Sequence, residues 1–249
     1  MTVLSALYLP ASAQNDPHSY SRPSETRVKH LDLDLKVDFE RRELSGTAAW
    51  NLERTSSNRL VLDVRHMEIK SVKAGGKPLA FSLGESSPIL GQALTIELPK
   101  SARRVVVEYV TKPEAAALQW LNPNQTAGGE EPFLFTQSQA ILARTWIPCQ
   151  DTPGVRFTYN ARIQVPGRLL ALMSASNPTK LDPTGRYEYE MSMPIPSYLM
   201  ALAVGDVRFE PLGARTGIYA EPVTLKAAAH EFAETENMVE AVEKMYGPY

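Results

Sequence analysis

Cysteine is nearly absent from the sequence of 249 residues, which contains only Cys149. A single cysteine cannot form a disulfide within the chain, so the fold must hold together without such cross-links, and we expect a small buried thiol in a turn. No run of residues reaches the ~18 apolar side chains that a membrane-spanning helix needs. Neither sign of charge is in excess, because 26 Lys and Arg against 28 Asp and Glu give a net charge of −2. The sequence therefore indicates a soluble globular protein and gives no sign of a nucleic-acid partner or a membrane span.

Catalytic motifs are also missing. No serine lies in a Gly-x-Ser-x-Gly turn, and no glycine-rich phosphate loop follows a strand and opens a helix. A zinc peptidase motif needs two histidines one helical turn apart with a glutamate between them, and the nearest match, His230 to Glu234, has a glutamate in place of the second histidine. We therefore predict no catalytic and no metal-binding residue in this chain. The alternative is an independent metalloprotein that uses His230 and Glu234, and it predicts stoichiometric zinc.

The sequence does contain strong alternation of apolar and polar residues. The pattern runs from Val28 to Phe39 and returns from Leu44 to Leu52, so the two segments can pair as an antiparallel ribbon. The same pattern predicts a second long strand from Val155 to Val165. Shorter apolar runs predict further strands at 60–64, 69–72, 79–83, 94–98, 105–110, 169–174, 187–193 and 198–207. Strand-and-turn spacing of this kind is typical of a β-sandwich or a layered β domain.

The C-terminal residues change from strand to helix. After a strand near 216–220, apolar residues recur at helical spacing from Leu225 to Tyr246, and Gly247 and Pro248 then stop the pattern. The spacing predicts one long helix. Its apolar stripe needs a partner surface, and no residues follow Tyr249 to provide one. We therefore expect the chain to be a fragment.

The densest unusual chemistry lies between Phe133 and Pro153, after residues 113–131, whose composition favours a long loop. Residues 133–135 can form a short buried strand. Gln137 and Gln139 stand two apart and so project from the same face of an extended backbone. The run Pro148-Cys149-Gln150-Asp151-Thr152-Pro153 predicts a rigid corner, because its two prolines fix φ and Asp151 can bond to its own backbone. The two amides suggest a recognition edge, although amides bonded within a β edge fit the same pattern.

At these residues the sequence resembles the zinc aminopeptidases of the gluzincin family, closest to the branch of leukotriene A(4) hydrolase and aminopeptidase N. Residues 137–140, Gln-Ser-Gln-Ala, are similar to the family's Gln-x-Gln-Ala segment, and residues 144–153 are similar to its Arg-x-x-x-Pro-Cys-x-Asp-x-Pro corner. The resemblance covers most of the chain from about residue 19. It implies a mainly β fold, with a saddle-like layered β-sheet N-terminal domain over 19–212. It also implies that residues 213–249 are the first strand and helix of a thermolysin-like α/β catalytic domain, after a signal remnant or arm at 1–18.

The resemblance also implies a function for the central stretch. Gln139 resembles the residue that the family's β domain lends to the wall of the substrate pocket, and Gln137 and Ala140 belong to the same segment. The expected substrate-binding residues are therefore Gln139, Gln137 and Ala140, and the expected partners are a peptide substrate and the catalytic domain of the same polypeptide. Zinc is expected in the intact parent protein and not in this chain, which should be inert alone. A free-standing β-sandwich that binds peptide or carbohydrate is the alternative, and it predicts that the final helix docks on the β domain.

The N-terminal residues carry an expectation about the compartment. Met1 to Gln14 is similar to the apolar tail of a secretory signal, with a small-x-small cleavage site at Ala11-Ser12-Ala13, but a basic leader is missing. If Met1 to Ala13 is a truncated signal, the protein is periplasmic or secreted. If the segment is a loose extension, the protein is cytoplasmic.

Overall fold

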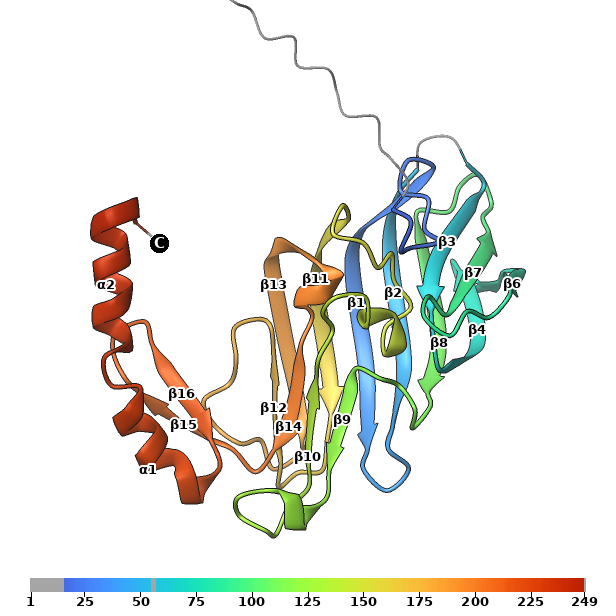
Figure 1. Cartoon of the computed structure of the whole chain (residues 1–249). Coiled ribbons are helices and arrows are strands. Elements are labelled where there is room, and N and C mark those ends of the chain that lie inside the picture. Colours follow the sequence, from blue (N-terminus) through green and yellow to red (C-terminus); the bar gives the residue numbers. More distant parts are fainter. Residues whose placement is uncertain (1–15, 55–56, 249) are drawn as a thin grey trace, which may run out of the picture.

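The computed structural model describes residues 16–54 and 57–248, and strands dominate it (Figure 1). The signal-like segment Met1–Ala13 lies outside these residues. The strands are β1 (Thr26–Asp38), β2 (Glu43–Arg54), β3 (Arg59–Val64), β4 (Met67–Ala74), β5 (Lys77–Pro78), β6 (Phe81–Leu83), β7 (Gln92–Glu97), β8 (Arg104–Thr111), β9 (Leu118–Leu121), β10 (Phe133–Thr136), β11 (Arg156–Gln164), β12 (Leu170–Met173), β13 (Arg186–Pro196), β14 (Leu202–Gly205), β15 (Arg208–Pro211) and β16 (Gly217–Ala220). The helices are η1 (Pro123–Gln125), η2 (Ala143–Thr145), η3 (Ser197–Leu199), α1 (Pro222–Glu231) and α2 (Thr235–Tyr246). The predicted mainly β class is confirmed.

The alternating segments build a seven-stranded sheet in the order β13-β11-β1-β2-β8-β4-β5. β1 and β2 pair antiparallel, as predicted, with Leu31 opposite Trp50. On its other side β1 pairs with β11, and here the strands run parallel with Leu33 opposite Ala161. These four side chains are buried because period-two alternation turns every second residue of each strand toward the core. The other face of the sheet is polar.

Two smaller sheets complete the β domain. One has the order β12-β14-β10-β9 and the other β3-β7-β6. Two tyrosines of the large sheet bond to the backbone of β12 and of the residue before it. The Tyr189 hydroxyl donates to the carbonyl of Ala171 at 2.6 Å, and the Tyr187 hydroxyl donates to the carbonyl of Leu169 at 3.0 Å. Buried side chains from all three sheets form one continuous core. The three sheets therefore stabilise one another through this shared core, which also packs against the buried face of β10.

Residues 113–131 are more ordered than predicted. They contain the strand β9 and the short helix η1, where a loop was expected. β9 forms because its four residues pair with β10, with Leu121 opposite Phe133 and Leu118 opposite Thr136. So short a strand is specified by its partner across the sheet, which no local pattern reveals.

The C-terminal region differs from the prediction of one long helix. The structure has two, because the first ends at Phe232 and the hydroxyl of Thr235 donates to the Phe232 carbonyl at 2.6 Å to start a new turn. Arg215, in the turn between β15 and β16, then directs α2 by pairing with Glu236 at 2.9 Å and Glu243 at 2.8 Å. No residue of either helix is buried. The predicted boundary between residues 212 and 213 falls in this β15–β16 turn, and it stays a prediction.

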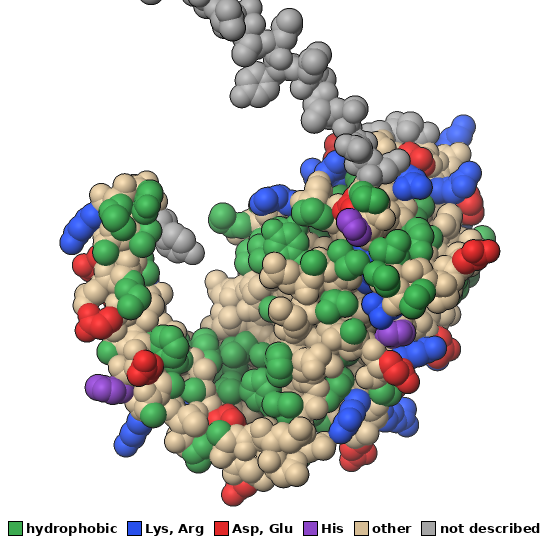
Figure 2. All heavy atoms as spheres, in the orientation of Figure 1, with side chains coloured by type: hydrophobic (Ala, Val, Ile, Leu, Met, Phe, Trp, Pro, Cys, Tyr) green, Lys and Arg blue, Asp and Glu red, His purple; other side chains and the backbone are tan. Residues whose placement is uncertain are grey.

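The helices stand away from the β domain and give the molecule the outline of a C (Figures 1 and 2). Apolar side chains remain exposed on them, among them Phe232 at 54%, Met238 at 63% and Val242 at 49%. The apolar stripe that the helical spacing predicts is therefore exposed to solvent in these helices. Within residues 16–54 and 57–248, neither α-helix has the length and apolar character to span a bilayer.

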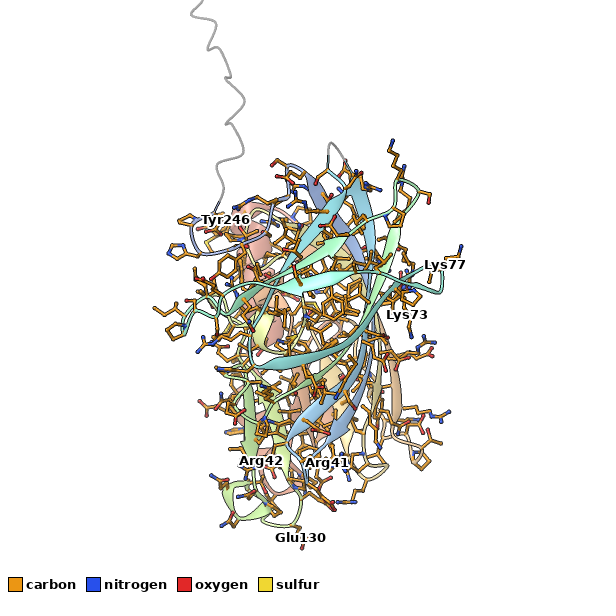
Figure 3. All side chains as sticks on the ribbon, turned by 90° about the vertical axis from the view of Figure 1, so that its right-hand side faces the viewer. Arg41, Arg42, Lys73, Lys77, Glu130 and Tyr246 are labelled. Atoms are coloured by element: carbon orange, nitrogen blue, oxygen red, sulfur yellow. The ribbon has the colours of Figure 1, made fainter. Side chains whose placement is uncertain are left out.

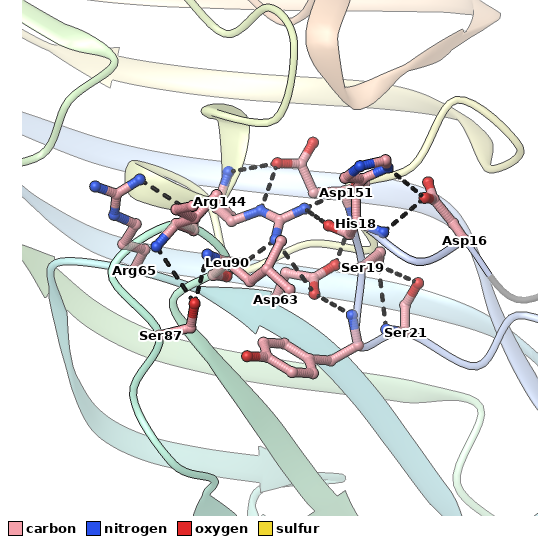
Figure 4. A network of polar contacts seen from close by, with 12 residues as sticks. Asp16, His18, Ser19, Ser21, Asp63, Arg65, Ser87, Leu90, Arg144 and Asp151 are labelled. Atoms are coloured by element: carbon pink, nitrogen blue, oxygen red, sulfur yellow. Dashed lines mark hydrogen bonds and ion pairs between the residues drawn. The ribbon is translucent and has the colours of Figure 1, made fainter.

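The predicted corner lies beside a fully buried arginine (Figure 4). The Asp151 carboxylate was expected to bond to its own backbone, but it accepts instead from Arg144 and from the Ser197 hydroxyl at 2.6 Å. The Arg144 guanidinium donates to the Asp151 carboxylate at 2.9 Å and to the carbonyls of His18 at 2.8 Å and Leu90 at 2.9 Å. Asp63 lies 3.8 Å from the same guanidinium. Four segments that are distant in sequence therefore contact the Arg144 guanidinium.

Asp63 in turn holds the residues that precede β1. Its carboxylate accepts from the Ser19 hydroxyl at 2.5 Å, from the Tyr20 amide at 2.7 Å and from the Asp151 amide at 3.0 Å. Cys149 is buried beside this cluster, as expected, and burial raises the pKa of its thiol well above the ordinary value. The thiol is therefore protonated and unreactive at neutral pH.

Replacing the central arginine tests this account. In Arg144→Met, Asp63 and Asp151 stay buried without their counter-charge, so we expect the free energy of unfolding to fall by about 3–5 kcal/mol. The control Arg104→Met breaks an exposed pair with Asp32 and should change it by less than about 1 kcal/mol. Urea denaturation followed by tryptophan fluorescence measures both, because Trp50 and Trp146 are buried in the core. Equal losses in the two variants would contradict the role given to Arg144.

Candidate functional site

The candidate site runs from Phe135, within β10, to Ala140, which lies beyond Thr136, the last paired residue of that strand. Side chains alternate along it: Leu134 and Ser138 are buried, whereas Phe135, Gln137 and Gln139 are exposed. The two amides therefore project from the same side of an extended backbone, as the spacing predicts. The peptide bond between Gln139 and Ala140 is cis, and Ala140 is exposed as well.

Buried hydrogen bonds fix the backbone behind the two glutamines. The Ser138 hydroxyl donates to the Met200 carbonyl at 2.7 Å and accepts from the Trp146 indole at 3.1 Å. The backbone N–H of Gln137 donates to the Ala117 carbonyl at 2.9 Å. Ser138 thus links the segment both to the residues before β14 and to the rigid corner, and the glutamines are presented from a fixed frame.

The side-chain amides of the glutamines have no hydrogen-bond partner among residues 16–54 and 57–248. The only hydrogen bonds found on these two residues involve the backbone, and the expectation that the amides bond within a β edge is not met in this part of the chain. A free carboxamide offers one acceptor and two donors without a charge to desolvate. The pair can therefore bind polar backbone groups of a ligand.

Phe135 belongs to the same exposed row and was missed by the sequence reading, which placed it in a buried strand. It is 40% exposed, and its ring lies 6.4 Å from that of Phe133. The Phe133 ring covers Gly205, where an added Cβ would come within 2.1 Å of a ring carbon. The period-two spacing of Phe133, Phe135, Gln137 and Gln139 could have predicted that Phe135 lies on the same side as the two glutamines. Hydrophobic side chains gather in the hollow between the helices and the β domain (Figure 2).

The metal donors of this chain do not form a zinc site. His230 lies in α1 and Glu234 lies beyond the end of that helix, where its carboxylate accepts from the Asn237 amide at 2.6 Å. Within the described ranges, no three His, Cys, Asp or Glu side chains are grouped in a way that could hold a metal. A zinc ion needs three or four such ligands at one point, so the residues present do not fit it.

A second hollow lies on the polar face of the seven-stranded sheet and has a volume of about 600 Å³. Four of its charged side chains form ion pairs: Arg104 with Asp32, and Arg162 with Asp34 at 3.2 Å. Glu188 and Glu190 line the same hollow and have no ion pair among the described residues. Partial burial opposes ionisation of Asp32, but hydrogen bonds from Arg104 and Asn160 outweigh it and hold the pKa of the carboxyl below its usual value. Both arginines that line this hollow are held by aspartates, so neither is free to bind an anionic ligand. We therefore take Phe135, Gln137 and Gln139, the glutamine row, as the candidate site.

Comparison with known proteins gives a consistent result over nearly the whole chain. The Peptidase M1 N-terminal domain matches residues 22–199. Leukotriene A-4 hydrolase of Xenopus laevis is 41% identical over 94% of this chain and 40% of its own length. Leucine aminopeptidase 2 of Yarrowia lipolytica is 37% identical over 95% of this chain and 37% of its own length. The structure of yeast LTA4 hydrolase in complex with bestatin superimposes with a TM-score of 0.89 at 32% identity, over 97% of this chain and 39% of that one. The chain thus spans about two fifths of the length of these relatives.

The site geometry makes a prediction about stability. Ser138→Ala leaves the buried Trp146 indole and the Met200 carbonyl without their partner, so we expect the free energy of unfolding to fall by about 1–3 kcal/mol. Gln137→Ala and Gln139→Ala remove exposed side chains without partners and should each change it by no more than about 0.5 kcal/mol. Urea denaturation measures all three variants. A large loss in either glutamine variant would show that its amide is structural.

Proposed function

The chain belongs to the M1 peptidase family, as its N-terminal domain, and on that premise we propose that it forms one wall of the substrate pocket of a zinc aminopeptidase. In this proposal Gln139 and Gln137 bind the backbone of a peptide near its N-terminus, and Ala140 forms the adjoining surface. The reaction is hydrolysis of the N-terminal residue from the peptide.

The observation that carries the proposal is the pair of free amides on a fixed frame. Ser138 is buried between them and bonded on both sides, so the backbone is already ordered before a ligand binds, and only the two side chains lose freedom on binding. A peptide backbone presents alternating donors and acceptors, which carboxamides complement in both senses. Phe135, in the same row, offers an apolar contact to a neighbouring substrate side chain.

The hydrolytic chemistry is assigned to a separate domain of the parent protein. Zinc activates a water molecule in such enzymes, but the described residues of this chain do not fit that ion. The described residues do offer contact surfaces for another domain, in the exposed apolar side chains of α1 and α2. The role of this chain is therefore to bind and orient the substrate.

The alternative of a free-standing binding module is less well supported. It predicted that the final helix packs on the β domain with its apolar stripe covered. Both helices instead lack buried residues, and Met238 and Val242 are exposed. A bare apolar face fits a chain that contacts a further domain.

The proposed role of Gln139 can be measured in the parent enzyme. We expect Gln139→Ala to lower kcat/KM for an aminoacyl-coumarin substrate by about threefold to tenfold, which is the value of one hydrogen bond to substrate. The control is Gln92→Ala, which removes an exposed amide that bonds to the Gly84 carbonyl in another sheet. Unchanged kcat/KM for both Gln139→Ala and Gln137→Ala would overturn the proposed binding role.

The division of labour makes a separate prediction for the 249-residue chain alone. Purified without any further domain, it should not hydrolyse aminoacyl-coumarin substrates, with or without added zinc. Steady-state fluorescence assays in the presence and absence of a chelator test this. Peptidase activity that co-purifies with the chain and is abolished by the chelator would refute the assignment of chemistry to another domain.

A further inference from the structure

The carboxylate of Glu221, the residue before α1, joins the C-terminal helices to the β domain. The Glu221 side chain reaches the loop after η1 and accepts from the backbone amides of Ala127 at 2.9 Å and Gly128 at 3.2 Å. Both carboxylate oxygens are used. Two successive backbone amides directed at one anion form a small anion-binding concavity, and here the anion is supplied by the chain itself.

Glu221 is also the residue at which the helical unit begins. It is the N-cap of α1, and its carbonyl accepts from the amides of Thr224 at 2.9 Å and Leu225 at 3.0 Å. Its backbone therefore sets the start of the helix while its side chain holds the β domain. Pro222 follows at the first helical position and restricts the backbone further. Glu221 thus belongs to both parts, and the hydrogen bonds of its carboxylate restrict where α1 begins relative to the loop after η1.

The loop that receives the carboxylate is itself braced. The Thr126 hydroxyl donates to the carbonyls of Pro123 at 2.8 Å and Glu131 at 3.1 Å. Arg42, in the turn between β1 and β2, donates to the Asn122 side chain at 3.0 Å. Figure 3 shows Arg41 and Arg42 at the same end of the molecule as Glu130 of this loop, whereas Tyr246 of α2 lies toward the opposite end. The amides of Ala127 and Gly128 are therefore fixed to the β domain.

A second contact completes the attachment. The Tyr219 hydroxyl, on β16, lies 3.2 Å from the Pro178 carbonyl and 3.4 Å from that of Asn177, which follows β12. Arg215 and Glu236 tie α2 to the β15–β16 turn. The hairpin and both helices thus form one unit, which Glu221 and Tyr219 hold against two separate loops.

From these contacts we infer that Glu221 is a positioning residue, whose carboxylate, bound by the Ala127 and Gly128 amides, sets the angle between the helical unit and the β domain. The angle fixes the width of the hollow inside the C. The inference concerns the geometry of this chain and holds whether or not the proposed peptidase role is found.

Spin labels can measure the angle in the 249-residue chain. Labels are attached at Glu190→Cys on β13 and Lys244→Cys on α2, both exposed, while the native Cys149 is 1% exposed and escapes labelling. Pulsed dipolar spectroscopy gives the distribution of distances between them. In Glu221→Ala we expect a shifted mean and a wider distribution. Glu221→Gln keeps an acceptor oxygen and should stay close to the parent.

Two further variants make the test decisive. Gly128→Pro removes one of the two donors from the loop side and should shift the distribution in the same direction as Glu221→Ala. Glu231→Ala removes an exposed carboxylate at the end of α1 and should leave the distribution unchanged. Urea midpoints from tryptophan fluorescence report on the β domain separately. Parental distributions in both Glu221→Ala and Gly128→Pro would overturn the inference, and so would a loss of stability in Glu221→Ala with its distribution unaltered.

Discussion

The positive charge of Arg144, buried in η2 where the corner begins, is the constraint on which the rest of the β domain depends. A guanidinium out of water is tolerated only when its donors are satisfied and its charge is balanced. Here the partners come from the segment before β1, from β3, from the loop before β7 and from the corner itself. The same corner holds Trp146, whose indole bonds to Ser138. The glutamine row is therefore fixed by the interaction that also closes the domain.

Much of this architecture could be predicted from local pattern. Long alternating segments predicted β1, β2 and β11, because a strand with one face in water has polar and apolar residues in alternation. The corner was predicted from its two prolines, whose preferences act within a few residues, whereas Asp151 bonds to Arg144 and Ser197 and not to its own backbone as predicted. The exposed positions of Gln137 and Gln139 follow from the same period of two. These features share one property, that the residues which determine them are neighbours in sequence.

Features set by distant partners could not be predicted. β9 exists because β10 lies beside it, and Arg144 is neutralised by Asp63, which is far from it in sequence. Phe135 is exposed because the outer face of a small sheet is left uncovered, although its own residue type favours burial. The direction of α2 depends on Arg215, which pairs with residues of that helix from a neighbouring hairpin. The Glu221 carboxylate likewise finds its amides more than ninety residues away.

The parallel pairing of β1 with β11 has a consequence for how the chain is made. β1 lies in the interior of the large sheet, yet one of its neighbours is among the later strands to leave the ribosome. Until residues 156–164 are synthesised, the β1–β2 ribbon carries an open edge with unpaired amides and carbonyls beside a row of leucines. Such an intermediate is a target for chaperones and for pairing with other nascent copies. The large sheet can therefore close around β1 only after residues 156–164 have been synthesised.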